Sequence, residues 1–171
     1  MLIRILMVDF RKITLDSVRW LPKTRKALPL SPKIKVQIPS APCSVTLLPG
    51  RYAMCLDLVG HIAFPAFVDF VRSVENHAML NADPPTGLRW LSCISDIDST
   101  SPSLKLSAFD DAAFFDALGN VHANPTDIRG CQCLCEISGA WVNDSYWGLR
   151  WKVLEIKESP DARHPCLFVL S

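Results

Sequence analysis

Two long runs of alternating apolar and polar residues near the end of the chain restrict its fold more than any other feature. Cys131 to Val142 and Tyr146 to Lys157 both follow the period of two that is typical of a β-strand. Asn143-Asp144 between them is a two-residue turn signal, so we expect an antiparallel hairpin. The apolar side of the second run changes after Val153, which predicts a bulge of the kind that lets one strand serve two sides of a small closed barrel.

Shorter strand patterns precede this hairpin. In Lys33 to Ile38 the apolar residues alternate with polar ones, which predicts a half-buried strand with a basic outer face, and Pro39 and Pro42 are expected to end it. The segment from Arg11 to Pro32 is rich in basic residues and prolines and is expected to be largely irregular. Further strands are predicted for Met1 to Phe10, Arg51 to Val59, Leu88 to Ser95, Leu104 to Phe109 and Ala112 to Asp116.

One segment has a helical period instead. Between Pro65 and Leu80 the apolar residues recur at steps of three and four, and a proline is tolerated in the first turn of a helix. This pattern predicts one main helix over about 65–80. An alternative stays open further along, where Asp110 could cap a helix through Leu118 in place of a strand.

The length and composition are those of one β-rich domain. With 171 residues, 49% of them hydrophobic, the chain can build one sizeable core and is short for two. We expect one domain over 1–171, with a basic arm over about 1–32 and a short tail over about 159–171. No apolar run approaches the ~20 residues that a membrane helix needs, so neither a membrane span nor a membrane partner is expected.

The net charge of +1 hides a strong asymmetry along the chain. Through Lys35 there are nine Lys and Arg residues against two Asp, a net charge of +7, and the remainder has a net charge of −6. A basic segment on a nearly neutral molecule can attract phosphates, and an ordinary solvated segment is the alternative.

Neither a metal site nor a catalytic motif is evident. The seven cysteines are odd in number, and alternate residues such as Cys131, Cys133 and Cys135 share one side of a strand, so we expect reduced thiols in an intracellular protein and no bound metal or other cofactor. The sequence has no phosphate-binding glycine loop and no hydrolase signature, which indicates that the protein is not an enzyme. Paired carboxylates, Asp96 with Asp98 and Asp110 with Asp111, leave a Mg²⁺-dependent nuclease as an alternative.

Aromatic residues beside cations indicate a binding function. Trp20 lies between Arg19 and Lys23, and the closing hairpin has tyrosine and tryptophan beside Arg150 and Lys152. Aromatic rings can stack on the exposed bases of a single strand while cations follow its backbone. Trp147 and Trp151 share one side with aliphatic residues, so for them a core position is favoured.

The chain also resembles a known family, the OB-fold single-stranded-DNA-binding proteins of large eukaryotic DNA viruses, and more distantly those of phages. The resemblance covers about 33–157 and depends on a strand ending in Gln37-Ile-Pro39, the segment Gly50 to Leu58, the Phe-rich helix, the Trp90 strand, Phe114 to Asn120, and above all the final Gly148-Leu-Arg-Trp-Lys152. It implies an OB-type Greek-key β-barrel that coats replication or recombination intermediates without catalysis.

These observations lead to one main hypothesis, which is sequence-independent binding of single-stranded DNA. The residues expected to contact DNA are Lys12, Arg19, Trp20, Lys23, Arg25, Lys26, Lys33, Lys35, Arg51, Tyr52, Tyr146, Arg150 and Lys152. RNA, a second copy of the chain and replication proteins are further possible partners, at a nuclear or a cytoplasmic replication site. The alternative is a non-catalytic OB-type subunit of a larger complex that binds RNA or protein.

Overall fold

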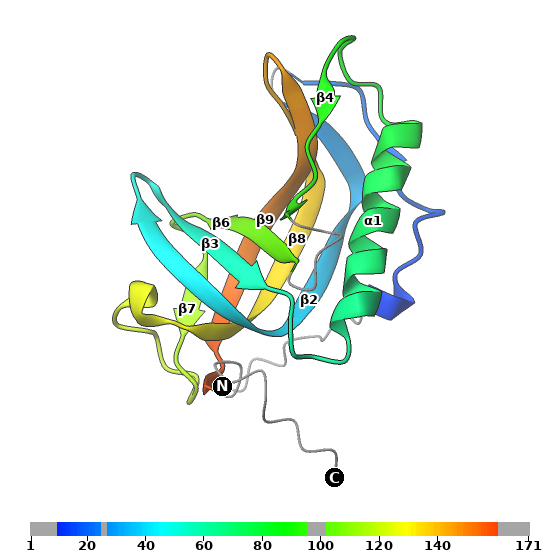
Figure 1. Ribbon diagram of the computed structural model, residues 1–171. Coiled ribbons are helices and arrows are strands. Elements are labelled where there is room, and N and C mark those ends of the chain that lie inside the picture. The colour runs from blue at the N-terminus through cyan, green and yellow to red at the C-terminus, as the bar shows by residue number, and fades with distance from the viewer. Residues whose placement is uncertain (1–9, 25–26, 96–101, 161–171) are drawn as a thin grey trace.

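The computed structural model describes residues 10–24, 27–95 and 102–160 of this chain (Figure 1). One mixed sheet of nine strands is accompanied by one main helix, so the predicted β-rich fold class is confirmed. The strands are β1 (Arg19–Trp20), β2 (Ala27–Leu48), β3 (Arg51–Asp57), β4 (Arg89–Trp90), β5 (Ile94–Ser95), β6 (Ser103–Ala108), β7 (Ala113–Phe115), β8 (Gly130–Val142) and β9 (Tyr146–Glu158). They lie in the order β4-β9-β8-β2-β3-β6-β5, with β1 paired to β2 and β7 paired to β9.

The longest strand, β2, lies at the centre of this order and joins the two halves of the sheet. Its first part pairs with β8, and its last residues pair with β3. The expectation of a strand that ends at Pro39 is therefore wrong, and so is the expectation of an irregular segment where β2 covers residues 27–32. The ladder with β8 shifts register between Pro29 and Ile34 and again between Ile38 and Ala41, and such irregular positions tolerate a residue without an N–H donor.

The predicted closing hairpin is confirmed as β8 and β9, which pair along their whole length. At the turn, Asn143 Oδ1 accepts hydrogen bonds from the backbone N–H groups of Ser145 (2.9 Å) and Tyr146 (2.7 Å). The predicted bulge is also present. Leu134 pairs with Glu155 and Cys135 pairs with Val153, so Leu154 is the extra residue that changes the buried side of β9.

The predicted helix is confirmed as α1 (Phe64–Asn81), which has Pro65 in its first turn and contacts η1 (Phe10–Lys12), β1 and β9 (Figure 1). Its buried face contains Phe67, Val71, Val74 and Ala78, the residues that recur at steps of three and four. Before the sheet, the short 3₁₀ helix η1 (Phe10–Lys12) packs against α1, with 5.4 Å between the ring centres of Phe10 and Phe67. Among the described residues, no helix is long and apolar enough to cross a membrane.

Two other segments differ in part from the sequence prediction. Leu88 to Ser95 is not one strand but the two short strands β4 and β5, because residues 91–93 turn toward α1. Over 112–116 the strand prediction is confirmed as β7, and the alternative helix from Asp110 is wrong. Phe114 of β7 is buried with its ring 5.0 Å from that of Tyr52, and β7 pairs in parallel with β9, so tertiary packing decides the conformation here. The expected strand over Met1 to Phe10 lies almost wholly outside the described residues, as does most of the tail.

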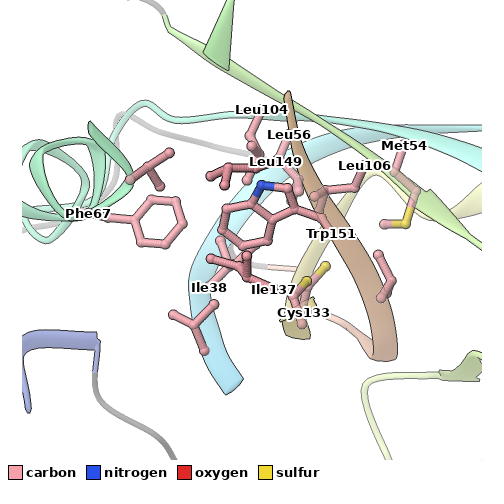
Figure 2. Packing of buried hydrophobic residues seen from close by; sticks show 14 of the residues in the cluster. Ile38, Met54, Leu56, Phe67, Leu104, Leu106, Cys133, Ile137, Leu149 and Trp151 are labelled. Atoms are coloured by element: carbon pink, nitrogen blue, oxygen red, sulfur yellow. The ribbon is translucent and has the colours of Figure 1, made fainter. Parts of the chain in front are cut away.

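The core fills the space between the two halves of the sheet and α1. Trp147 and Trp151 are only 5% and 7% exposed, as expected from their position beside aliphatic residues. Figure 2 shows the Trp151 ring among side chains from several strands. Cys131, Cys133 and Cys135 are buried in the same cluster, so the core-facing side predicted for them is confirmed. Burial raises the pKa of the Cys135 thiol above its usual range.

Between β7 and β8 the chain forms the short 3₁₀ helix η2 (Pro125–Asp127), which precedes Arg129. The Arg129 guanidinium donates hydrogen bonds to the backbone oxygens of Thr126 (2.6 Å) and Ile128 (3.2 Å). This segment leads the chain back to Gly130, where β8 begins beside β2.

Candidate nucleic-acid interface

A groove of about 690 Å³ lies between the two halves of the sheet. Strands β2, β3 and β6 form one side, and the β8–β9 hairpin with residues 91–95 forms the other. Figure 1 shows the β2–β3 and β8–β9 hairpins diverging toward the left and the top of the view. The lining residues are Ser44, Thr46, Arg51, Ala53, Met54, Cys55, Leu91, Ser92, Cys93, Ser95, Lys105, Leu106, Ser107, Phe109, Trp141, Leu149, Arg150 and Trp151.

Strand register places the polar side chains of the first side together. Ser44, Cys55 and Lys105 are direct neighbours across β2, β3 and β6, and residues opposite each other in a sheet point to the same face. The next row on this face consists of small residues at positions 46, 53 and 107. Alternate residues point the other way into the core, as buried Met54 does. The side chains that this half of the sheet presents to the groove are therefore mostly small or polar.

The groove has a positive charge that nothing in its lining offsets. Arg51, Lys105 and Arg150 line it, and none of the described lining residues is Asp, Glu or His. Arg51 Nη1 donates a hydrogen bond to Ser107 Oγ at 3.4 Å, and neither Lys105 nor Arg150 has an ion-pair partner among the described residues. A concave surface of one sign focuses its field, so this groove attracts anions.

Aromatic side chains line the same groove. Phe109 is 44% exposed and follows β6 directly, whereas Trp151 is almost fully buried beneath the surface. Trp141 is half-buried and lies over Gly148, where a Cβ atom would be 3.1 Å from the indole Cζ2 and 2.5 Å from the Leu91 carbonyl oxygen. Gly148 therefore allows the second side of the groove to close against β9. Phe109 is the most exposed aromatic ring in the described lining of this groove.

Glu75 holds the second side of the groove in place from behind. This residue of α1 is only 5% exposed, and its carboxyl group accepts hydrogen bonds from Ser92 Oγ (2.9 Å) and from the backbone N–H of Cys93 (3.0 Å). The Cys93 thiol donates to it as well at 3.4 Å, and the pKa of that thiol is raised by burial and by the adjacent Glu75. Glu75 was not among the residues predicted from the sequence. The available signal was an acidic residue on the apolar stripe of the helix, since Glu75 follows Val71 by four positions.

A second groove of about 720 Å³ adjoins the first, and the two share Phe109, Arg150 and Trp151 in their linings. Lys33 and Lys152 also line the second groove, so a residue of the basic segment and a residue of the closing hairpin lie on one surface. Lys35 belongs to the same surface, because it lies opposite Glu136, which in turn lies opposite Lys152.

Unlike the first groove, the second contains carboxylates. Lys33 Nζ lies 3.1 Å from Glu136, and Lys152 Nζ lies 2.5 Å from Asp111. Lys152 holds the pKa of the Asp111 carboxyl below its usual range. Asp110 lines this groove too. The second groove is therefore close to neutral.

Several residues that were predicted to bind DNA lie elsewhere. Trp20 is half-buried against α1, where its Nε1 donates a hydrogen bond to His77 Nδ1 at 3.1 Å. Tyr52 points to the core side of β3 and packs edge-on against Phe114, while its neighbour Arg51 faces the groove. The structure does not bring these two rings into the groove.

The remaining predicted residues that the structure describes line neither groove. Lys12 and Arg19 are exposed on η1 and β1, both of which contact α1. Lys23 is exposed next to Thr24, which lines the second groove, and Tyr146 is 39% exposed at the outer end of β9. Arg25 and Lys26 lie outside the described residues. Contact of all these residues with DNA stays a prediction.

The second groove and its surroundings also bear on the nuclease alternative. Over residues 10–24, 27–95 and 102–160, no group of three or more His, Cys, Asp or Glu side chains could hold a metal ion. Asp96 and Asp98 lie outside those ranges, and Asp111 is engaged by Lys152.

Comparison with known proteins gives the fold. No family model matches the chain, and no curated protein does. The structure of gp2.5, a single-stranded DNA binding protein encoded by bacteriophage T7, matches with a TM-score of 0.50 at 12% identity, over 81% of this chain and 100% of that chain. The fold is an OB fold. The single-stranded DNA-binding protein from bacteriophage Enc34 in complex with ssDNA has a TM-score of 0.48 at 12% identity, over 84% of this chain and 96% of that one.

Both of these structural neighbours are proteins of bacteriophages. In this OB fold the bent β2 joins the two halves of the sheet, and the cationic groove lies where those halves diverge. The three cations come from β3, β6 and β9, so the fold alone brings them together.

Proposed function

We propose that this protein binds single-stranded DNA, largely independently of sequence, in the groove between the two halves of its OB fold. The observation that supports this most directly is the lining itself, which combines Arg51, Lys105 and Arg150 with no carboxylate and with the exposed ring of Phe109. Cations that follow phosphates and an aromatic face that stacks on a base are the two elements of sequence-tolerant single-strand binding.

In the proposed complex the two elements act on different parts of the strand. The cations neutralise successive phosphates and release their counterions, which gives affinity that falls with salt. The Phe109 ring stacks on a base, which only an unpaired strand presents as an open face. The hydroxyl groups of Ser44 and Thr46 beside them can donate hydrogen bonds to phosphate or sugar oxygens. Because none of these contacts reads a base edge, binding does not depend on sequence.

The OB fold shared with gp2.5 of bacteriophage T7, a single-stranded DNA binding protein, agrees with this proposal. We further propose that the protein is not an enzyme and that it protects or organises replication or recombination intermediates. The absence of Asp, Glu and His from the described lining of the groove supports the proposal that the protein is not an enzyme, because such residues activate water or hold Mg²⁺. We also propose that the protein is related to the single-stranded-DNA-binding proteins of large eukaryotic DNA viruses. Binding to a second copy of the chain and to replication proteins is part of the same proposal.

The experiment that tests this function is a fluorescence-polarisation titration with labelled oligo-dT, in competition with unlabelled oligo-dT, RNA and duplex DNA. We expect oligo-dT to bind with micromolar or tighter affinity, duplex to compete poorly, and binding to weaken steeply as salt is raised. Affinity for duplex equal to that for oligo-dT, or binding that is insensitive to salt, would refute the proposal. Size-exclusion chromatography with and without oligo-dT tests the assembly-subunit alternative, which predicts no DNA-dependent shift.

A further inference from the structure

The cationic surface does not end with the first groove, because Arg150 lines both grooves. Lys152 is two residues further along β9, on the same side of the strand and about 6.6 Å away. A single strand that leaves the first groove past Arg150 therefore meets Lys152 next. In the free protein this lysine is already paired with Asp111, which lies between β6 and β7.

The two ion pairs of the second groove differ in how firmly they are held. The Glu136 side chain in the pair with Lys33 is 11% exposed, and a buried carboxylate that loses its partner is strongly destabilised. The side chains of Lys152 and Asp111 are 41% and 59% exposed. An ion pair that is this open to water contributes little to stability, and a competing anion can replace its carboxylate.

We propose that Lys152 is a second phosphate-binding position, which Asp111 occupies in the free protein and which a phosphodiester of the bound strand takes over. The inference rests on the proposed function and extends its binding surface from the first groove into the second. Asp111 acts as an internal competitor for Lys152, so it lowers the affinity of the protein for single-stranded DNA. Glu136 stays with Lys33 and takes no part in the exchange.

This inference predicts that loss of an acidic residue strengthens binding only at one position. We expect Asp111→Asn to bind oligo-dT about two- to fivefold more tightly than wild type in fluorescence polarisation at moderate salt, the range that an exposed ion pair can supply. The matched control is Asp110→Asn, which removes the same charge from the neighbouring residue of the same groove. Asp110 has no ion pair with Lys152. The change in log K for Asp110→Asn is therefore expected to be less than half of the change for Asp111→Asn.

A double-substitution cycle separates direct competition from a general effect of charge. In a Lys152→Ala background, Asp111→Asn is expected to change the affinity no more than Asp110→Asn does, because the cation that Asp111 competes for is absent. Persistence of the gain in that background, an equal gain from Asp110→Asn, or no gain from Asp111→Asn in the wild-type background would overturn the inference. If wild type itself fails to bind oligo-dT, the proposed function is refuted first and the inference falls with it. Thermal denaturation of each variant checks that all of them are folded.

Discussion

Neutralising the cations of the first groove one at a time tests whether the phosphates of a bound strand contact these cations. Arg51→Gln, Lys105→Gln and Arg150→Gln each remove one positive charge from a partly or fully exposed side chain, so all three variants are expected to fold. Each phosphate contact on a single strand contributes about 0.7 to the slope of log K against log salt. Three contacts give a slope of about −2.1, so the contribution of the groove to affinity falls about 18-fold between roughly 50 and 200 mM salt.

Each single variant is expected to reduce that slope to about −1.4, which corresponds to about a 7-fold fall over the same salt range. The assay is fluorescence polarisation with labelled oligo-dT at four or more salt concentrations, from which the slope is fitted. Lys157→Gln is the matched control, because Lys157 is exposed near the end of β9 and lines neither groove. Its slope is expected to equal that of wild type.

The comparison between groove and control decides the outcome. If Lys157→Gln changes the slope as much as Arg150→Gln does, the affinity reflects the overall charge of the protein and not the groove. If the three groove variants keep the wild-type slope, phosphates do not contact these residues, and the proposed path of the strand is wrong.

Four further substitutions test other parts of the structure. Phe109→Ala is expected to weaken oligo-dT binding about 5- to 150-fold, the equivalent of ~1 to 3 kcal/mol for one stacked base, with an unchanged salt slope; a changed slope would argue against stacking. Glu75→Gln is expected to lower the free energy of unfolding by ~1 to 3 kcal/mol in urea denaturation and to weaken DNA binding by displacing residues 91–93. Unaltered binding together with reduced stability would show that Glu75 has no part in positioning the groove. Gly139→Ala is expected to lower the free energy of unfolding by more than about 3 kcal/mol in urea denaturation, because the added Cβ would lie 2.2 Å from the Leu28 carbonyl oxygen at φ +148°. For Gly119→Ala the added Cβ would have nothing within 4 Å at φ +92°, so the free energy of unfolding is expected to fall by only about 1 kcal/mol.

Local patterns in the sequence predict those elements whose structure depends on neighbouring residues. The closing hairpin, the bulge near Leu154 and the helix over Phe64–Asn81 all follow from the period of the apolar residues. The core position of Trp147 and Trp151 follows from the same period. These features could be predicted because a strand or a helix must point one face toward the core whatever the rest of the fold.

The prolines within β2 show where reasoning from neighbouring residues fails. Pro39 and Pro42 indicate the end of a strand when only neighbours in sequence are considered, yet β2 continues through them. The bends at its irregular positions are stabilised by the strands that pair on either side, and those partners lie far away in the sequence.

The composition of the interface was likewise decided by the tertiary structure. The charge asymmetry pointed to the basic segment, whereas the groove is lined by Arg51, Lys105 and Arg150, which are more than forty positions apart in the sequence. Trp20 has the right neighbours in sequence but hydrogen-bonds to α1. The sequence by itself determined which residues alternate, turn and coil, because those properties are local. Only the packing of the two halves of the sheet decided which cations share a surface, and which of them a carboxylate already holds.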